Sequence, residues 1–542
     1  MRVTSTGHAG FLIETTGGSI LCDPWFNPTF FGSWFVFPRN DGLDPTPLSN
    51  PDYLYISHFH RDHLDPRFLT EHVSKDATVL LPAYGVDVLE HALRDIGFTR
   101  FVRTSNGEVI ELDGDLRIGI QSLAGPHIGP MGDSMLAVAD PTAVVLDQND
   151  AHPADLDFVK AFGPVDAHLL QYSGAIWYPM VYEIPEEEEF RLIEAKRRRQ
   201  LDRATTYIEM VGARHVVPSA GPPCFIDEGM MDLNDLPGGR PSIFPDATVF
   251  IDHLRSVGHD EAHLTVPGTS LEVGGPGDGT IVHPIPESEV RAIFADKAAY
   301  LERYREDMAD VIATEHASWP TDTTDLLAEM TEWLDPILAI AHHTREGVGA
   351  PVTLRTDDGL AIVIDMPAGR VRALEPGERT PFEFGMARPL LEAAVRNRTG
   401  DWCNELFLSC RFTARRDGPY NEYVYTFFKS LSMDRMRYAE EYYGAQLADD
   451  DVEWIELDGW IVESRCPHQK ASLARMGSVC DGRLTCGLHG WEFDLATGTG
   501  TNSEGLTLRV RGRVDHPDAD PVETAGSEPS ESPSGVRGGE QT

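Results

Sequence analysis

Basic residues are scarce in this sequence relative to acidic ones. The chain carries 45 Lys and Arg against 87 Asp and Glu, which gives a formal net charge of −42. A surface this acidic repels phosphate backbones, so we expect no nucleic-acid partner. The acidic excess is explained either by a merely solvated surface or by a docking face for a basic partner.

Long apolar runs and paired cysteines are lacking as well. No apolar run reaches the roughly 18 residues of a membrane-spanning helix, and the N-terminus lacks the apolar core of a signal peptide, so we expect no membrane partner. The seven cysteines are odd in number and mostly scattered. This argues against a disulfide framework and predicts a cytoplasmic protein.

The N-terminal half alternates strand-like and helix-like segments. Hydrophobic residues make up 41% of the 542 residues, and a chain of this size suits several domains of about 150 residues each. A buried strand is expected at Asp52–Ser57 and a long helix from Glu186 to about Gly212, whereas 240–285 predicts loops and edge strands. The alternation predicts an α/β domain over 1–285.

The rest of the chain predicts two further domains and a tail. Residues 286–445 suggest helices followed by an α+β module, with a hairpin at Val352–Leu374 and strands at Glu405–Thr413 and Tyr423–Phe428. Residues 446–516 predict a small all-β domain. Residues 517–542, rich in Pro, Ser, Gly and Glu, predict a disordered acidic tail. The predicted fold class is therefore multidomain, α/β plus β.

Two Cys/His pairs stand near the C-terminal end. Cys466-Pro-His468 and Cys486-Gly-Leu-His489 have the ligand pattern of a Rieske [2Fe–2S] cluster, in which two thiolates hold one iron and two imidazoles hold the other. A zinc ribbon could use the same four ligands. The continuation Gly490-Trp-Glu-Phe-Asp494 disfavours zinc, because it resembles the ferredoxin-like Rieske domains of oxygenases.

A one-electron carrier requires a redox partner. We therefore expect an external electron donor, such as a ferredoxin, a cytochrome b5-type protein or a flavin reductase. The acidic surface would then be a docking face for a basic donor.

A second metal site is predicted directly after the strand at 52–57. His58, His60, Asp62 and His63 form an H-x-H-x-D-H run. Downstream, His127 follows Gly-Pro, and Asp150 lies just beyond an apolar strand, where a bridging carboxylate would sit; Asp147 is the alternative. His58, His60 and His127 would hold one metal, and Asp62, His63 and Asp150 a second. Such nitrogen and oxygen ligands suit iron, zinc or manganese.

This ligand order resembles the metallo-β-lactamase superfamily over residues 1–225. The resemblance implies an αββα sandwich with metals at the edge of its sheets, and a last His ligand after the long helix. No His occurs at Ser219-Ala-Gly221, so the second site is either open or completed by water or substrate. His215 stands before a strand with no evident ligand role, and His253 is a distant candidate.

A closer resemblance, over about 1–230, is to the CMP-N-acetylneuraminate hydroxylase family, which joins a lactamase-like domain to a Rieske domain. The stretches that carry it are Gly7-His8-Ala9, Asp23-Pro-Trp25, Gly32-Ser-Trp34, the run from Tyr55 to Leu64, Ser173-Gly-Ala175, Tyr178-Pro-Met180, and Ala195–Arg198 leading to Pro218–Gly221. In that family the Rieske domain comes first, whereas here it comes last. The module near 330–440 resembles sterol-carrier-type domains, which implies a substrate-covering or dimerising role; a packing spacer is the alternative.

Together the two sites predict an oxygenase. A hydrolase of this fold has no use for an electron carrier, so we expect one or two iron ions that activate O₂ on a small polar substrate, such as a nucleotide sugar or a natural-product intermediate. His8 and Asp62 are the candidate catalytic residues, although His8 could instead belong to the core, and Asp23 could orient a ligand His. The alternatives are a metallohydrolase with a regulatory Rieske domain, and an electron-transfer protein with a lactamase-like scaffold. A homo-oligomer is expected if the cluster cannot reach the metal site of its own chain.

Overall fold

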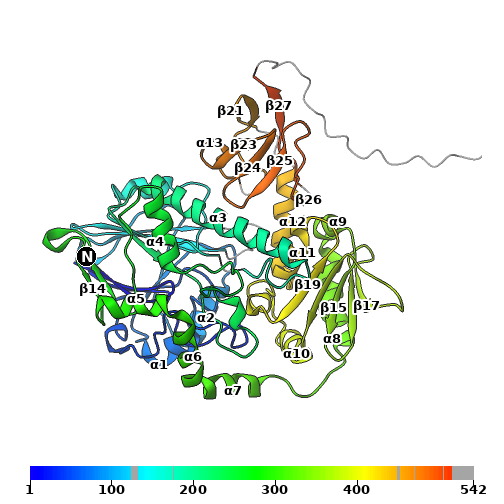
Figure 1. Ribbon diagram of the computed structural model, residues 1–542, viewed down its shortest axis with the longest axis horizontal. Coiled ribbons are helices and arrows are strands. Elements are labelled where there is room, and N and C mark those ends of the chain that lie inside the picture. Colours follow the sequence, from blue (N-terminus) through cyan, green and yellow to red (C-terminus); the bar gives the residue numbers. More distant parts are fainter. Residues whose placement is uncertain (124–131, 175, 448–451, 469, 505, 515–542) are drawn as a thin grey trace, which may run out of the picture.

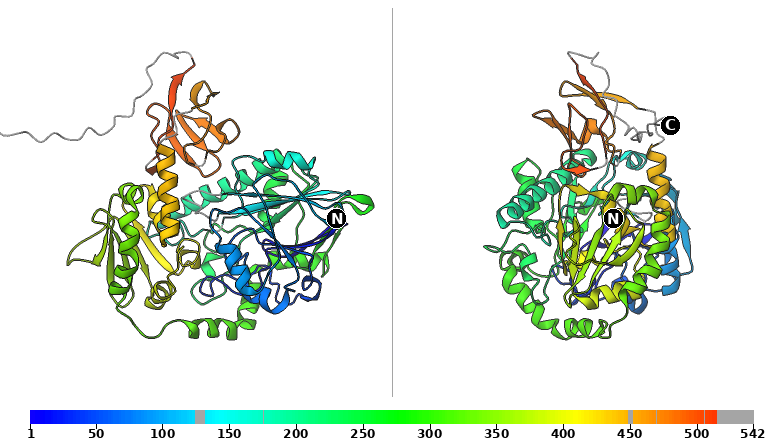
Figure 2. Two further views of the ribbon diagram at one scale, coloured as in Figure 1. Left: turned by 180° about the vertical axis from the view of Figure 1, so that it is seen from behind. Right: turned by 90° about the vertical axis from the view of Figure 1, so that its right-hand side faces the viewer.

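The computed structural model describes residues 1–123, 132–174, 176–447, 452–468, 470–504 and 506–514 (Figure 1). Three parts are visible. A large α/β domain occupies the N-terminal half, an α+β module stands beside it, and a small β domain lies above the junction of the two (Figures 1 and 2). Among the described residues, no helix is long and apolar enough to cross a membrane. The predicted tail, 517–542, lies outside the described residues.

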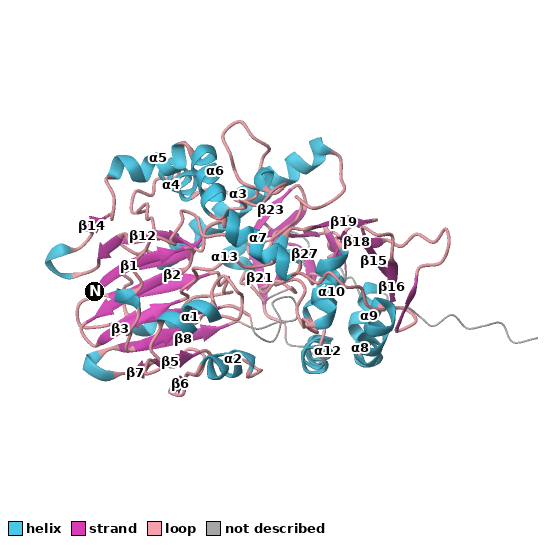
Figure 3. Cartoon of the chain, turned by 90° about the horizontal axis from the view of Figure 1, so that it is seen from below, coloured by secondary structure: helices cyan, strands magenta, loops and turns pink. Residues whose placement is uncertain are grey.

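The N-terminal domain is built on two facing sheets (Figure 3). The first has the order β14-β13-β1-β2-β3-β4-β5-β6 and the second the order β12-β11-β10-β9-β8-β7. The strands of the first sheet are β1 (Arg2–Gly7), β2 (Gly10–Thr15), β3 (Gly18–Cys22), β4 (Tyr53–Tyr55), β5 (Thr78–Leu81), β6 (Phe101–Arg103), β13 (Ser270–Glu272) and β14 (Ile281–Val282). Those of the second are β7 (Ile110–Glu111), β8 (Arg117–Ser122), β9 (Ser134–Ala139), β10 (Val144–Asn149), β11 (Ala167–Gln171) and β12 (His215–Ser219).

Alternation along the strands produces the layers of this domain. On β2, Phe11 and Ile13 point into the core between the sheets, whereas Leu12 points to the opposite face, against α1 and α2. The outer face of the second sheet is covered by α3 and α4. The helices are α1 (Pro66–His72), α2 (Val88–Ile96), α3 (Glu186–Val211), α4 (Ala247–Ser256), α5 (Glu287–Ala295), α6 (Lys297–Asp307) and α7 (Ala309–Ser318). The result is the predicted αββα sandwich. Helix α4 lies in the segment 240–285, where only loops and edge strands were expected.

The α+β module packs helices on a five-stranded sheet of order β17-β16-β15-β18-β19. Its strands are β15 (Val352–Thr356), β16 (Ala361–Asp365), β17 (Arg370–Ala373), β18 (Phe382–Met386) and β19 (Phe412–Arg416). Its helices are α8 (Leu326–Ile340), α9 (His342–Val348), α10 (Arg388–Arg396), α11 (Glu422–Lys429) and α12 (Met433–Leu447). The expected hairpin at 352–374 forms as β15, β16 and β17.

Two strand predictions in this module are wrong. Tyr423–Phe428 belongs to helix α11, because the Asn421 side chain accepts hydrogen bonds from the first amides of the helix, at 3.0 Å from Tyr423 N and 3.3 Å from Val424 N. Val424, Phe427 and Phe428 are buried at helical spacing, so tertiary packing overrides the strand preference of aromatic residues. The strand expected at Glu405–Thr413 starts only at Phe412.

The small β domain consists of two three-stranded sheets, β21-β22-β27 and β23-β24-β25. Its elements are β21 (Trp454–Leu457), β22 (Trp460–Glu463), α13 (Leu473–Met476), β23 (Gly477–Cys480), β24 (Arg483–Cys486), β25 (Trp491–Asp494), β26 (Ser503–Glu504) and β27 (Val510–Arg513). This domain contacts both others. Strand β26 pairs with β20 (Tyr420–Asn421) of the module, and Arg203 Nη1 on α3 donates to the Leu488 carbonyl at 3.1 Å.

Candidate metal centres

Loops at one edge of the sandwich bring several His and Asp side chains together. Strand β4 pairs in parallel with β3 and β5, and the chain after β4 carries His58, His60 and His63. Asp133 immediately precedes β9, and Asp150 immediately follows β10. Strand pairing therefore places five potential ligands from three separate segments around one point.

The ligand atoms form three overlapping groups, each with its atoms within 4.8 Å of one another. The groups are His8-Asp62-His63, His58-His60-Asp133 and His58-His63-Asp150. His58 Nε2 lies 2.7 Å from His60 Nδ1 and 3.7 Å from Asp133 Oδ1. Two of the groups share His58 and two share His63, which suits two neighbouring metal ions.

Several of these atoms are buried without a hydrogen-bond partner in the described part of the chain, namely Asp62 Oδ1, His63 Nε2 and Asp150 Oδ1. His63 Nε2 lies 3.5 Å from Asp150 Oδ2 and 3.7 Å from Asp62 Oδ2, which is too far for a good hydrogen bond. Unsatisfied buried polar atoms cost free energy, so an unpaired set needs an explanation. A bound cation would be coordinated by these oxygen and nitrogen atoms, so the residues present fit a metal centre.

The charges of this cluster shift the pKa values of its members. Burial alone would lower the pKa of His63, but the carboxylates of Asp150, Asp23 and Asp62 outweigh it and raise that pKa well above its usual value. Burial would raise the pKa of Asp62, but His63 and His8 lower it. Burial and the Asp150 carboxylate raise the pKa of Asp133 to about 7. This concentration of coupled groups is typical of functional sites.

Two neighbouring residues hold the imidazoles in place. Asp23 Oδ2 lies 2.8 Å from His63 Nδ1, and its carboxylate also accepts from the amide and hydroxyl of Ser57, at 2.7 and 2.5 Å. The Ser57 hydroxyl lies 2.8 Å from His58 Nδ1. Carboxylate–histidine contacts of this kind set the tautomer that leaves the other nitrogen free for metal.

His8 contacts the cluster directly. Its Nε2 lies 3.0 Å from Asp62 Oδ2, and its ring packs edge-on against those of Trp25 and His63. The residue has a φ of 53°, a left-handed conformation that is uncommon outside glycine. The structure thus places His8 beside a ligand carboxylate and on the rim of the core.

Trp25 and Trp34 are buried in the hydrophobic core, as is most of Trp177.

The other predicted ligands are distributed as follows. His127 lies outside the described residues. Asp147 is buried within β10, next to the Cys22 thiol, and belongs to none of the three groups. His215 pairs with His263 and Asp278, at 3.0 and 3.1 Å. His253, on α4, lies 3.7 Å from Asp202. Neither histidine joins the groups.

Asp133 was not among the predicted ligands. The sequence signal was available, since an Asp stands directly before an apolar strand, as Asp150 stands directly after one. Pairing of β9 with β10 places Asp133 near Asp150, and packing of this sheet against the sheet that contains β4 brings its side chain to His58. Neither arrangement could be derived from local sequence.

The four Cys and His residues of the β domain converge as well. Cys466 follows β22 and Cys486 ends β24; both are buried, and a hydrogen bond from Cys466 lowers the pKa of the Cys486 thiol. The rings of His468 and His489 lie 4.9 Å apart, and His468 stacks on Trp491 at 4.4 Å. Two sulfurs and two imidazoles at the tips of adjacent loops fit a Rieske cluster.

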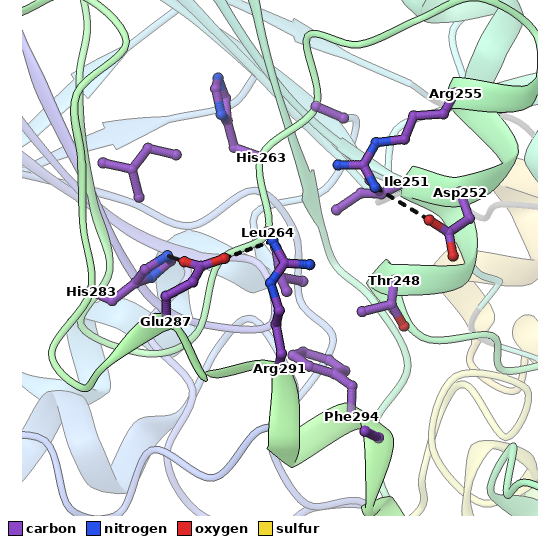
Figure 4. A pocket seen from close by; sticks show the side chains of 13 residues that line it. Thr248, Ile251, Asp252, Arg255, His263, Leu264, His283, Glu287, Arg291 and Phe294 are labelled. Atoms are coloured by element: carbon purple, nitrogen blue, oxygen red, sulfur yellow. Dashed lines mark hydrogen bonds and ion pairs between the residues drawn. The ribbon is translucent and has the colours of Figure 1, made fainter. Parts of the chain in front are cut away.

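A separate cavity of about 520 Å³ lies between α4 and α5 (Figure 4). Its charged side chains largely neutralise one another. Arg255 contacts Asp252 at 3.3 Å, and Glu287 contacts both Arg291 at 2.7 Å and His283 at 3.0 Å. None of its lining residues belongs to either metal centre.

Three family models match the chain. A β-lactamase superfamily domain matches residues 2–125, an Rv3818-like, SCP2-like domain matches 326–445, and a Rieske [2Fe–2S] domain matches 437–508. They confirm the predicted fold class and support the [2Fe–2S] cluster. Among solved structures, the metallohydrolase Igni18 from Ignicoccus hospitalis and the diiron β-hydroxylase CmlA from Streptomyces venezuelae each match 50% of this chain, and 97% and 54% of their own, with 17% identity and a TM-score of 0.33.

The relatives extend over nearly the whole chain. A protein of Mycobacterium tuberculosis named as the Rieske 2Fe–2S iron–sulfur protein Rv3818 is 45% identical over 94% of this chain and 99% of its own length. A protein of Mycolicibacterium smegmatis with the same type of name is 45% identical over 94% of this chain and 100% of its own. The chain therefore belongs to this family of Rieske 2Fe–2S iron–sulfur proteins.

Proposed function

We propose that the protein is a Rieske-dependent iron oxygenase, which hydroxylates a small polar substrate at the lactamase-fold metal centre. The observation that carries the proposal is the direct packing of the cluster-binding domain on the domain that holds the His/Asp cluster. Arg203 hydrogen-bonds the carbonyl next to the cluster ligand His489, and both domains share one hydrophobic core. Metal-dependent hydrolysis needs no electron carrier at this position.

The residues of the two sites have distinct tasks in this proposal. When bound, the cluster and the iron supply single electrons and the activation of O₂. Cys466, Cys486, His468 and His489 would hold the cluster. The members of the three His/Asp groups other than His8 would hold the iron. Asp23 orients His63, and His8 positions the Asp62 carboxylate.

In this proposal the α+β module covers the bound substrate. Burial and Asp150 raise the pKa of Asp133 against the opposing effect of the Lys429 ammonium on α11, and burial lowers the pKa of His60 against the opposing effect of the Asp401 carboxylate. Charged groups of the module therefore act on the metal centre. A polar substrate bound between the two domains would be shielded from water by this module. Nucleotide sugars are one candidate class, suggested by the resemblance to CMP-N-acetylneuraminate hydroxylases, and natural-product intermediates are another. An external electron donor completes the proposal.

The alternative function is metal-dependent hydrolysis, with the Rieske domain acting as a regulator or electron-transfer unit. It is favoured by the ligand set itself, since His and Asp donors suit zinc as well as iron.

The test combines metal analysis with the reactivity of the reduced protein. We expect iron in both centres, the electron paramagnetic resonance (EPR) signal of a reduced Rieske cluster, and O₂ consumption by protein that was reduced and freed of reductant. His468→Ala should abolish this consumption by removing the cluster. His58→Ala should slow it while leaving the cluster signal intact. Zinc or manganese at the His/Asp site, together with turnover without reductant, would contradict the oxygenase and favour the hydrolase.

A further inference from the structure

One imidazole of the lactamase-fold domain contacts a ligand of the cluster. The ring of His152 lies 6.4 Å from that of His489, centroid to centroid, in an edge-on arrangement at 76°. The contact links two domains that are more than 300 residues apart in sequence. The β domain sits above the junction of the N-terminal domain and the α+β module (Figures 1 and 2).

His152 is also next to the His/Asp cluster along the chain. It follows Asp150 by two residues, in the loop after β10. Asp150 Oδ2 in turn lies 3.5 Å from His63 Nε2. Two peptide units therefore separate the residue that touches the cluster ligand from a carboxylate of the metal centre.

The surroundings hold the His152 ring in this position. Tyr207 of α3 lies parallel to it, at 1° and 6.5 Å. The Tyr207 hydroxyl donates to the Pro153 carbonyl at 2.8 Å, which anchors the loop to the helix. Nε2 of His152 is buried without a hydrogen-bond partner in the described residues. An unsatisfied buried nitrogen is costly for packing alone, so its retention points to a task at the interface.

The second imidazole ligand of the cluster contacts a different part of the chain. His468 Nε2 lies 3.6 Å from Glu422 Oε2 on α11, in the α+β module. That module provides none of the residues in the three His/Asp groups. We compare the contact of His489 with His152 and the contact of His468 with Glu422. Only two peptide units separate His152 from Asp150 of the metal centre, so the first contact is the shorter connection along the chain.

We propose that His152 is a positioning residue that couples the Rieske cluster to the metal centre of the same chain. The inference rests on the proposed function. An external donor gives one electron to the oxidised cluster and is itself oxidised by one equivalent. Passage of that electron past His489 and His152 reoxidises the cluster and reduces one ferric ion, held by His63 and Asp150, to the ferrous state. No bond forms or breaks.

The experiment follows an electron through the protein without O₂ or substrate. The full-length protein, loaded with cluster and ferric iron, is reduced by a laser-flash photoreductant, and the cluster absorbance is recorded over time. In the wild type we expect rapid reduction of the cluster followed by reoxidation as the iron accepts the electron. His152→Ala should slow this reoxidation by about 10- to 100-fold, the usual cost of removing a partner of a metal ligand.

Two further variants keep the result interpretable. His152→Leu fills most of the same space without an aromatic ring and should slow the reoxidation as His152→Ala does. His259→Ala removes a half-buried imidazole that contacts Glu261, at 2.8 Å, and should leave the rate unchanged. Cluster content, reduction potential and the relaxation of the cluster's EPR signal by the nearby iron should match the wild type in all three variants, which shows that docking is intact.

The outcomes separate the two proposals. Reoxidation in the wild type at a rate that both His152 variants retain would overturn the role of His152 and leave the oxygenase standing. The same holds if the variants slow reoxidation and the EPR relaxation shows that the cluster has moved away from the iron. Absence of reoxidation in the wild type itself would overturn both proposals.

Discussion

The Asp23 carboxylate holds the His63 imidazole from the side opposite the metal centre, with Asp23 Oδ2 2.8 Å from His63 Nδ1 and neither side chain exposed. A histidine fixed in this way presents Nε2 to the centre in a defined tautomer and direction. The pair combines a residue after β3 with one after β4, two parallel neighbours in the sheet.

Replacing this carboxylate should weaken metal binding. Asp23→Asn keeps the shape of the side chain but removes the charge that supports the His63 tautomer, so we expect the metal affinity to fall by about 10- to 100-fold. Titration of metal-free protein with iron(II) against a chromophoric chelator measures it. Asp52→Asn is the matched control, because the Asp52 carboxylate accepts hydrogen bonds from the amide and hydroxyl of Ser19 at the sheet surface. Equal affinities for Asp23→Asn and the wild type would contradict the assigned role.

Asp133 should act as a ligand and Asp147 should not. Asp133→Asn removes the carboxylate 3.7 Å from His58 and should lower the bound metal per chain, measured by elemental analysis, while the cluster's EPR signal persists. Asp147→Asn should leave the metal content unchanged. Burial raises the pKa of Asp147 well above its usual value, which favours the neutral acid that an amide resembles. Normal metal content in Asp133→Asn would exclude this carboxylate as a ligand.

The buried His168 should make the fold sensitive to acid. Burial lowers its pKa from 6.5 to about 3, so the unfolded chain binds this proton more readily than the folded one. The contribution to stability is complete above pH 6.5 and is lost as the pH falls toward 3, with a slope of up to about 1.4 kcal/mol per pH unit.

Removing this imidazole should flatten the acid limb of the stability profile. In His168→Gln, the loss of unfolding free energy between pH 7 and pH 5 should be smaller than in the wild type, as measured by urea denaturation. His259→Gln, which changes a half-buried imidazole, should follow the wild type. Parallel profiles for His168→Gln and the wild type would show that His168 does not titrate on unfolding.

A buried ion pair joins α4 to α6. Lys297 Nζ lies 2.6 Å from Asp246 Oδ1, and these side chains are only 1% and 8% exposed. Lys297→Met should destabilise the protein by about 3–5 kcal/mol, because it leaves the Asp246 carboxylate buried and unpaired.

Removing both charges should restore most of that loss. The double variant Lys297→Met with Asp246→Asn leaves no uncompensated charge. Thermal and urea denaturation of the single and double variants provide the comparison. A double variant as unstable as Lys297→Met alone would mean that packing, and not charge, dominates at this position.

Local sequence predicted the cluster ligands and the run from His58 to His63. Within each Cys/His pair, and within that run, the residues stand a few positions apart on one loop, so spacing along the chain translates directly into spacing between atoms. The order of strand-like and helix-like segments predicted an α/β domain, and the metallo-β-lactamase resemblance implied the sandwich. In the structure, the strand period of two residues places Phe11 and Leu12 on opposite faces of the sheet.

The local secondary-structure preference of the sequence predicted the wrong element where tertiary packing opposed it. Aromatic and β-branched residues at 423–428 favour a strand in isolation. The Asn421 cap and the burial of Val424, Phe427 and Phe428 on one face make the segment a helix. This helix carries Glu422 to within 3.6 Å of His468 and places Lys429 where its charge acts on Asp133.

The sequence by itself predicted a one-electron centre and a His/Asp metal site, because most ligands of each are encoded in short local motifs. Only the tertiary structure decided which distant residues complete them. Asp133 and His152 reach their positions because the two sheets of the sandwich face each other and because the β domain docks on α3. These contacts arise from burial summed over many residues, which no short motif records.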